Sequence, residues 1–233
     1  MTKNDLVKDY RKPISAPGLH DVILSEINHR FPNLDGLKVL DAPCGNGALS
    51  EVLAKAGALV DGFDLNPVQE SQYGATYQVK NIENCELDSE SYDIILSIEG
   101  IEHLHNPMAW FEKMARALKP GGIIILSTPN IDALSSRWKV LCFGFPKYFR
   151  PVPMKPHIFL TSGHIHPITS LFIKWACARN TLELDSVKTK SKRMPRLLET
   201  VLYNIFYSNF SQDIKALIKG SVAIYTIKKP GQF

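Results

Sequence analysis

Residues 39–50 read VLDAPCGNGALS, and this stretch decides the fold. A strand-like apolar run ends at Asp41, glycines follow at Gly45 and Gly47, and helical spacing begins near Ala48. Glycines at such a turn let a ligand approach the backbone, and the N-terminus of the next helix offers it unpaired N–H groups. The stretch therefore predicts a buried strand, a tight binding loop and a helix in succession.

The same alternation of strands and helices continues along the chain. Short apolar strands separated by amphipathic helices indicate an α/β fold, with a parallel sheet covered by helices on both faces. The expected strands lie at 38–42, 58–64, 75–79, 92–97, 122–128, 181–189 and 221–229. The expected helices lie at 19–31, 48–57, 106–120, 168–180 and 197–210.

Composition limits the class of protein. The chain has 233 residues, of which 45% are hydrophobic and 21% charged, so it is neither disordered nor a coiled coil and fits one elaborated domain. No apolar run reaches membrane-spanning length, and the first residues lack the apolar core of a signal peptide, which predicts a cytoplasmic protein. Its four cysteines form no CxxC pair and are expected to be free thiols.

Charge is unevenly distributed along the chain. Residues 137–196 carry twelve basic and two acidic side chains, whereas residues 1–136 carry eleven basic and nineteen acidic ones. Aromatic residues are interleaved with the basic ones at 143–149. This pattern suits an anionic amphiphile or a membrane face that carries one, and also nucleic acid, whose bases stack on aromatic rings. A set of core aromatics beneath a basic rim is the remaining interpretation.

Two carboxylates distinguish between the cofactors that use such a loop. Asp64 ends the next strand, 17 residues beyond Gly47, where it can accept both hydroxyls of a ribose. A dinucleotide fingerprint needs Gly or Ala where Ser50 stands, and the Asp41 carboxylate repels a pyrophosphate but attracts an ammonium or sulfonium group. The loop thus favours a positively charged nucleoside thioether, with a nicotinamide-dependent oxidoreductase as the alternative.

Four motifs, DAPCGNGAL, GFDLN, YDIILSIEGIEHLHNP and LKPGGIIILSTPN, occur in order within residues 38–130. In these motifs the chain resembles class I S-adenosylmethionine-dependent methyltransferases, in particular the branch that includes ubiquinone-biosynthesis O-methyltransferases. It departs from the family at Pro43, where the first loop glycine usually stands. The resemblance implies a doubly wound, mostly parallel, seven-stranded Rossmann-like sheet with helices on both faces and an antiparallel C-terminal strand.

The resemblance also implies an activity and a division of the chain. It implies in-line methyl transfer from S-adenosylmethionine to a small-molecule, lipid-linked or saccharide-linked acceptor, by O-methylation; a non-catalytic binding module is a further alternative. The chain would be one domain over 1–233, with a helical cap at 1–37, a cofactor-binding core at 38–130 and a basic, aromatic acceptor-side elaboration at 131–220. Its oligomeric state is left open.

Each matching position takes a role from the resemblance. The loop would hold the methionine part of the cofactor, Asp64 the ribose, and Leu65 and Asn81 the adenine, while the end of the fourth strand would line the methyl-donor pocket. The implied cofactor-binding residues are Asp41, Cys44, Gly45, Gly47, Asp64, Leu65, Asn81, Ser97 and Ile98.

An acceptor hydroxyl must lose a proton during methyl transfer, so a base is expected near the same strand ends. The candidate bases are Glu99, Glu102, His103, His105, His164 and His166. The pair Glu102–His103 could instead brace the loop by a hydrogen bond, and His105 could cap a helix. The residues predicted to act in catalysis are Glu99, His103, His164 and His166.

Two further kinds of site are not expected. The segment GHIHP places His164 and His166 two residues apart, but no third ligand is near in sequence, so no metal site is predicted. Residues 97–100 read SIEG and lack the Asn/Asp-Pro-Pro-Tyr/Phe signature of enzymes that methylate DNA amino groups. Nucleic acid is therefore not the expected partner.

Overall fold

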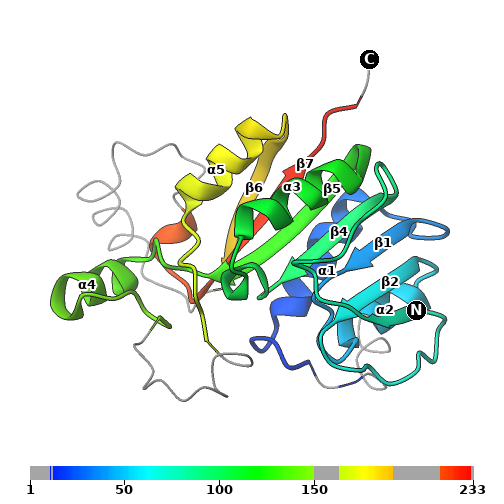
Figure 1. Cartoon of the computed structure of the whole chain (residues 1–233), viewed down its shortest axis with the longest axis horizontal. Coiled ribbons are helices and arrows are strands. Elements are labelled where there is room, and N and C mark those ends of the chain that lie inside the picture. The colour runs from blue at the N-terminus through cyan, green and yellow to red at the C-terminus, as the bar shows by residue number, and fades with distance from the viewer. Residues whose placement is uncertain (1–10, 12, 150–162, 191–215, 232–233) are drawn as a thin grey trace.

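A computed structural model describes residues 11, 13–149, 163–190 and 216–231 of the chain, and its centre is a seven-stranded sheet (Figure 1). The strand order is β3-β2-β1-β4-β5-β7-β6. The strands are β1 (Lys38–Asp41), β2 (Leu59–Asp64), β3 (Thr76–Val79), β4 (Tyr92–Ile98), β5 (Leu118–Pro129), β6 (Glu183–Lys190) and β7 (Val222–Lys228). The predicted mostly parallel sheet with an antiparallel C-terminal strand is confirmed, because β7 pairs antiparallel with both β5 and β6.

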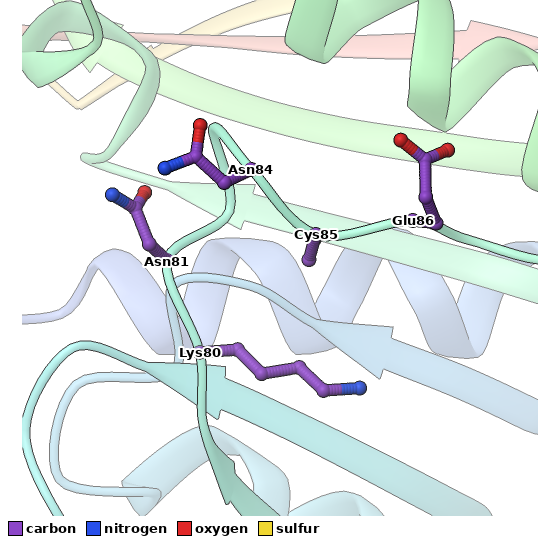
Figure 2. A pocket seen from close by; sticks show the side chains of 5 residues that line it. All are labelled: Lys80, Asn81, Asn84, Cys85 and Glu86. Carbon is purple, nitrogen blue, oxygen red and sulfur yellow. The ribbon is translucent and has the colours of Figure 1, made fainter.

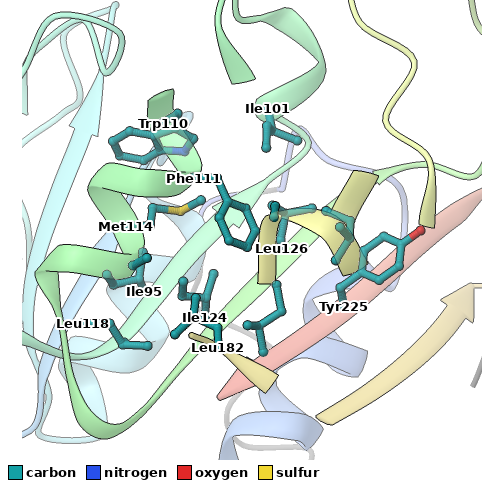
Figure 3. Packing of buried hydrophobic residues seen from close by; sticks show 14 of the residues in the cluster. Ile95, Ile101, Trp110, Phe111, Met114, Leu118, Ile124, Leu126, Leu182 and Tyr225 are labelled. Carbon is teal, nitrogen blue, oxygen red and sulfur yellow. The ribbon is translucent and has the colours of Figure 1, made fainter. Parts of the chain in front are cut away.

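Helices cover both faces of the sheet (Figure 1). Apolar side chains of α1 and α2 form one core with one face of the sheet, and those of α3 and α5 form a second core with the other. Figure 3 shows the second core, in which Phe111 and Leu126 lie at the centre, between Trp110 on one side and Tyr225 on the other. The helices are α1 (Leu19–Arg30), α2 (Ala48–Lys55), η1 (Ile101–His103), α3 (Pro107–Ala117), α4 (Leu134–Phe143) and α5 (Ser170–Arg179).

The sheet has a topological switch point between β1 and β4. The chain runs from β1 outward through β2 to β3, then returns to the other side of β1 as β4. Open α/β sheets bind ligands outside the carboxyl ends of the strands at such a point, because the connecting loops diverge there. The predicted cofactor residues lie at these strand ends.

Local sequence accounts for most element boundaries. Helix α3 begins where the Asn106 side chain accepts a hydrogen bond from the Ala109 N–H at 3.0 Å, with Pro107 in the first turn. Helix α4 was not predicted, and the helix expected at 197–210 lies outside the described residues. None of the described helices has the length and apolar character needed to cross a bilayer.

Candidate active site

The glycine loop closes over the end of β2 through backbone hydrogen bonds. The Cys44 N–H donates to the Phe63 carbonyl at 2.9 Å, and the Gly45 N–H donates to Asp64 Oδ2 at 2.9 Å. Gly47 is the N-cap of α2 and has φ +78°, a left-handed conformation that favours glycine. The predicted loop residues are therefore brought together with Asp64, and the thiol of Cys44 is buried.

Asp64 retains unused acceptor capacity although it is only 9% exposed. Its Oδ2 accepts from the Gly45 N–H, and its Oδ1 accepts from the Asn66 N–H at 3.0 Å and, at the long distance of 3.4 Å, from the Asn66 side-chain amide. A carboxylate oxygen has two lone pairs, so Oδ2 can accept one further strong hydrogen bond, and Oδ1 can do so when a stronger donor replaces the Asn66 amide. The pair matches two adjacent hydroxyl donors.

Asp41 lies deeper, at the end of β1, and is 1% exposed. The Ser50 hydroxyl donates to its Oδ2 at 2.6 Å. Burial raises the pKa of Asp41 to about 7, the Ser50 hydrogen bond lowers it, and the nearby Asp64 charge raises it. Ser50, which breaks the dinucleotide pattern, is thus the partner of this buried acid.

A segment near the N-terminus lies across the loop. Arg11 donates to the Asn46 carbonyl at 2.7 Å and to the carbonyls of Gln69 and Glu70 at 2.8 Å each. A side chain on Gly45 would collide with Ile14, because a Cβ there would lie 2.8 Å from Ile14 Cδ1. This bracing was not predicted, because a single Arg before the first helix carries no recognisable sequence pattern.

The end of β4 places its predicted residues in different environments. Ser97 is fully buried and its hydroxyl accepts from Trp110 Nε1 at 3.1 Å, so its side chain faces the core rather than a ligand. Ile98 also packs in the core. Glu99 has φ +48°, a strained conformation for a residue other than glycine, and its Oε2 accepts from the Ala16 N–H at 3.0 Å.

The two residues predicted to contact the adenine, Leu65 and Asn81, are exposed to solvent. Leu65 is 60% exposed, and Asn81 lies at the mouth of a pocket of about 270 Å³ together with Lys80, Asn84, Cys85 and Glu86. Figure 2 shows the Asn81 and Asn84 amides on one side of the turn and Lys80 extending away from them. Asn81 Oδ1 already accepts from the Glu83 N–H at 2.9 Å, which leaves its NH₂ group directed elsewhere.

Two segments about sixty residues apart form a cluster beside η1. The N–H groups of Ile165 and His166 donate to the Glu102 carbonyl at 2.8 and 3.0 Å. The rings of His103 and His164 have centroids 4.8 Å apart, whereas His166 Nδ1 is engaged separately, 2.7 Å from the Leu104 carbonyl. His105 is not part of the cluster; it pairs with Glu83 at the surface.

Glu102 completes this cluster, although only the two histidines were predicted to be catalytic. One potential ligand atom from each of Glu102, His103 and His164 lies within 4.8 Å of the others. Of the two histidines in GHIHP, only His164 belongs to this group, and Glu102 and His103 join it from a segment about sixty residues away in sequence. The absence of a metal stays a prediction.

Comparisons with known proteins agree with this geometry. Residues 19–187 match the sequence profile of a family described as "Methyltransferase domain". The chain is 31% identical over 186 residues to a ubiquinone biosynthesis O-methyltransferase of Coxiella burnetii (strain Dugway 5J108-111), covering 74% of this chain and 76% of that protein. It is 30% identical over 190 residues to the protein of the same name from Glaesserella parasuis, covering 76% and 77%.

Solved structures with a similar fold include S-adenosylmethionine-dependent methyltransferases. The crystal structure of an S-adenosylmethionine-dependent methyltransferase from Mesorhizobium loti superposes with a TM-score of 0.60 at 17% identity, covering 87% of this chain and 95% of that one. The glycine loop at the switch point, its two carboxylates and the sequence match over most of the chain lead to one conclusion. The chain belongs to the methyltransferase domain family and is an S-adenosylmethionine-dependent methyltransferase.

Proposed function

We propose that this enzyme methylates a hydroxyl oxygen of a small amphiphilic acceptor. The observation that carries the proposal is the cluster of imidazoles and carboxyl groups that follows β4 at η1. Gly100, just before η1, packs against Pro43 of the cofactor loop. A hydroxyl, unlike a thioether or a tertiary amine, must give up a proton when it is methylated, and these groups can receive it. The relatives named as O-methyltransferases support the same acceptor atom.

The residues of the loop fit S-adenosylmethionine. Asp64 Oδ2 has an acceptor position left for one ribose hydroxyl, and Oδ1 can accept the other in place of its long contact with the Asn66 amide. Buried Asp41 favours a nearby positive charge. Gly45 and Gly47 would present backbone to the methionine part, and Leu65 an apolar surface to the adenine. Asn81 would offer its NH₂ group or, after rotation, its oxygen. Of Ser97 and Ile98, only the backbone is proposed to line the site.

When bound, the cofactor supplies a methyl group activated on a positively charged sulfur. The chain has to hold the acceptor oxygen in line with that methyl group, exclude water and accept the hydroxyl proton. We assign proton transfer to His103 or His164 and a supporting role to Glu99 and His166. Glu99 would act by fixing the Ala16 segment over the site, because its carboxylate is already engaged there.

The acceptor is proposed to be reached at a membrane surface. Helix α4 extends away from the body of the sheet (Figure 1), and Trp138, Leu141 and Phe143 on it are exposed by 63%, 77% and 65%. Arg137, Lys139 and Lys147 lie in the same stretch. Exposed apolar side chains with flanking cations are typical of segments that insert into an anionic lipid surface. The helix predicted at 197–210 lies outside the described residues, so the proposal of a membrane surface does not rest on it.

A labelled-methyl assay tests the function. The purified chain and labelled S-adenosylmethionine are incubated with cell extract separated into organic-soluble, aqueous, protein and nucleic acid fractions. Label is expected in an organic-soluble product and should resist alkaline hydrolysis, as a methyl ether does and a methyl ester does not. Asp64→Ala should abolish the transfer, whereas Glu112→Gln, a surface change, should leave it intact. Label in protein or nucleic acid would refute the proposed acceptor.

A further inference from the structure

The side chain of Arg11 connects two loops that are distant from it in sequence. Its Nη1 donates to the Asn46 carbonyl in the glycine loop at 2.7 Å, and its Nη2 donates to the carbonyls of Gln69 and Glu70 at 2.8 Å each. Gln69 and Glu70 belong to the connection between β2 and β3, which forms neither helix nor strand over residues 65–75. One guanidinium group therefore joins the loop that follows β1 to the loop that follows β2.

These two loops would meet different parts of S-adenosylmethionine. In the proposed site, the glycine loop holds the methionine part, and the loop after β2 begins beside Asp64, the proposed partner of the ribose. Asp64 is itself oriented by both loops, because its Oδ2 accepts from the Gly45 N–H at 2.9 Å and its Oδ1 from the Asn66 N–H at 3.0 Å. A change in the spacing of the loops would therefore move the acceptor positions that the ribose hydroxyls need.

Arg11 also fixes the peptide between the two loop glycines. Gly45 and Gly47 have φ of +58° and +78°, and glycine adopts such angles without strain but has access to many others. The Asn46 carbonyl accepts from Arg11, and the Gly47 N–H donates to the Cys44 carbonyl at 2.9 Å, so this peptide is held on both sides. Holding a loop in its binding conformation before the ligand arrives lowers the entropic cost of binding.

The surroundings of Arg11 favour a guanidinium group. Its Cζ lies 5.5 Å from the centroid of the Tyr77 ring, and its Nη2 lies 4.0 Å from Oε1 of the buried Glu51. The Tyr77 hydroxyl donates to the same carboxylate oxygen at 2.8 Å. Arginine spreads its donors over a planar fork, whereas lysine carries all of its donors on one nitrogen at the end of a shorter side chain. Lysine at this position would keep the charge but lose the bridge between the loops.

We propose that Arg11 is a positioning residue for cofactor binding, which joins the glycine loop to the loop after β2 at the spacing that S-adenosylmethionine requires. The inference rests on the cofactor placement of the proposed function. Arg11 is assigned no contact with the methyl group or with the acceptor. It should therefore determine the affinity for the cofactor and leave the rate at saturating cofactor unchanged.

Calorimetric titration tests this role without an acceptor. S-adenosylhomocysteine spans both loops, so Arg11→Ala should raise its Kd by about tenfold or more, as expected when charge-assisted hydrogen bonds are lost. Arg11→Lys should raise this Kd nearly as much. Adenosine reaches mainly the loop after β2, so its Kd should rise by less than about threefold in both variants, because it gains little from the spacing of the loops.

Arg179→Ala is the matched control. The Arg179 guanidinium also lies against an aromatic ring, 5.7 Å from the centroid of Trp175, and its Nε donates to the Glu112 carboxylate at 2.9 Å, but it belongs to helix α5. This variant should bind both ligands as the wild type does. Circular dichroism at the titration temperature establishes that each variant is folded, and Arg11→Lys decides the test if Arg11→Ala does not fold.

Methyl transfer supplies a second readout. In the labelled-methyl assay, Arg11→Ala should show a raised cofactor KM and a kcat within about twofold of the wild type. Wild-type affinity in Arg11→Ala or in Arg11→Lys would overturn the proposal, since the bridge would then contribute nothing or its charge alone would suffice. Equal losses for adenosine and S-adenosylhomocysteine would also overturn it, because Arg11 would then act on one loop only. A wild-type chain that binds no S-adenosylhomocysteine would instead refute the proposed function.

Discussion

At the scale of single residues, the site is built from carboxyl groups withdrawn from water. Asp41, Asp64 and Glu102 are all at most 9% exposed, and each lies at or just beyond the carboxyl end of a strand. Burying a charge costs stability unless a partner offsets it, so these residues are poor choices for folding alone. The placement of Asp41 and Asp64 is explained by the cofactor groups that they are proposed to meet.

The buried acid Asp41 predicts a specific pH dependence of stability. Its pKa is about 7 in the folded chain against an ordinary value of 3.8, so the folded state holds a proton that the unfolded state has lost between these pH values. Its contribution therefore decreases as pH rises through this window and is constant above about 7. Relative to Asp41→Asn, the wild type should lose about 2–3 kcal/mol of unfolding free energy between pH 5 and 8.

Urea unfolding of both proteins at several pH values measures this difference. The asparagine keeps the Ser50 partner but does not titrate. Its own burial cost is therefore the same at every pH, and any change in the difference with pH comes from Asp41. A difference that stays constant from pH 5 to 8 would mean that Asp41 ionises normally in the folded chain. The same variant should bind S-adenosylhomocysteine more weakly.

At the scale of elements, helix α1 is tied to the β6–β7 edge by one buried residue. Glu26 is 1% exposed and forms ion pairs with Arg30 and Lys188, and the hydroxyls of Ser186 and Thr226 donate to its Oε2 at 3.2 Å each. The helix that covers the sheet behind the cofactor loop thus depends on strands formed at the end of the chain.

Glu26→Gln should destabilise the chain by about 2 kcal/mol, because it leaves Lys188 without its counter-charge and Arg30 with Asp185 alone. The loss is smaller than for a fully buried pair, because Lys188 is half exposed and water screens its charge. The surface pair Glu112–Arg179 is the matched control, and Glu112→Gln should cost less than about 1 kcal/mol. Thermal unfolding of the two variants makes the comparison. Equal losses would show that the network around Glu26 contributes no more than a surface pair.

At the scale of the whole molecule, charge and apolar surface are segregated. The predominantly acidic half contains the cofactor loop, and the basic third contains α4 with its exposed Trp138 and Leu141. If α4 meets lipid, the molecule presents its acceptor side to the membrane. Attraction between its cations and anionic lipid would then add to the burial of its apolar side chains.

Vesicle sedimentation tests this orientation. The chain should bind vesicles that contain anionic phosphatidylglycerol more tightly than purely zwitterionic ones, and less tightly at high salt. Replacing both Trp138 and Leu141 by Ala should weaken binding by at least about tenfold, because each side chain contributes on the order of 1–3 kcal/mol when buried. Leu171→Ala on α5, which removes an equally exposed apolar side chain, is the control. Equal effects of both changes would contradict docking through α4.

Local sequence determined the elements and the cofactor loop. The runs at 38–42 and 92–97 are mostly apolar, with consecutive apolar residues, because parallel strands are buried on both faces. The loop needs glycine because its backbone has positive φ at Gly45 and Gly47. Helix α4 was missed because its apolar residues are exposed and show no amphipathic period, so no burial pattern marks it.

Only the tertiary structure decided how distant residues combine. Glu102 meets His164 because segment 163–167 pairs with the η1 backbone; Arg11 reaches the glycine loop across 35 residues; and Ser97 turns into the core toward Trp110. Hydrophobic periodicity records which face of an element is buried, a short-range property of the chain. It carries no information about which two loops meet, because that depends on the packing of the whole sheet.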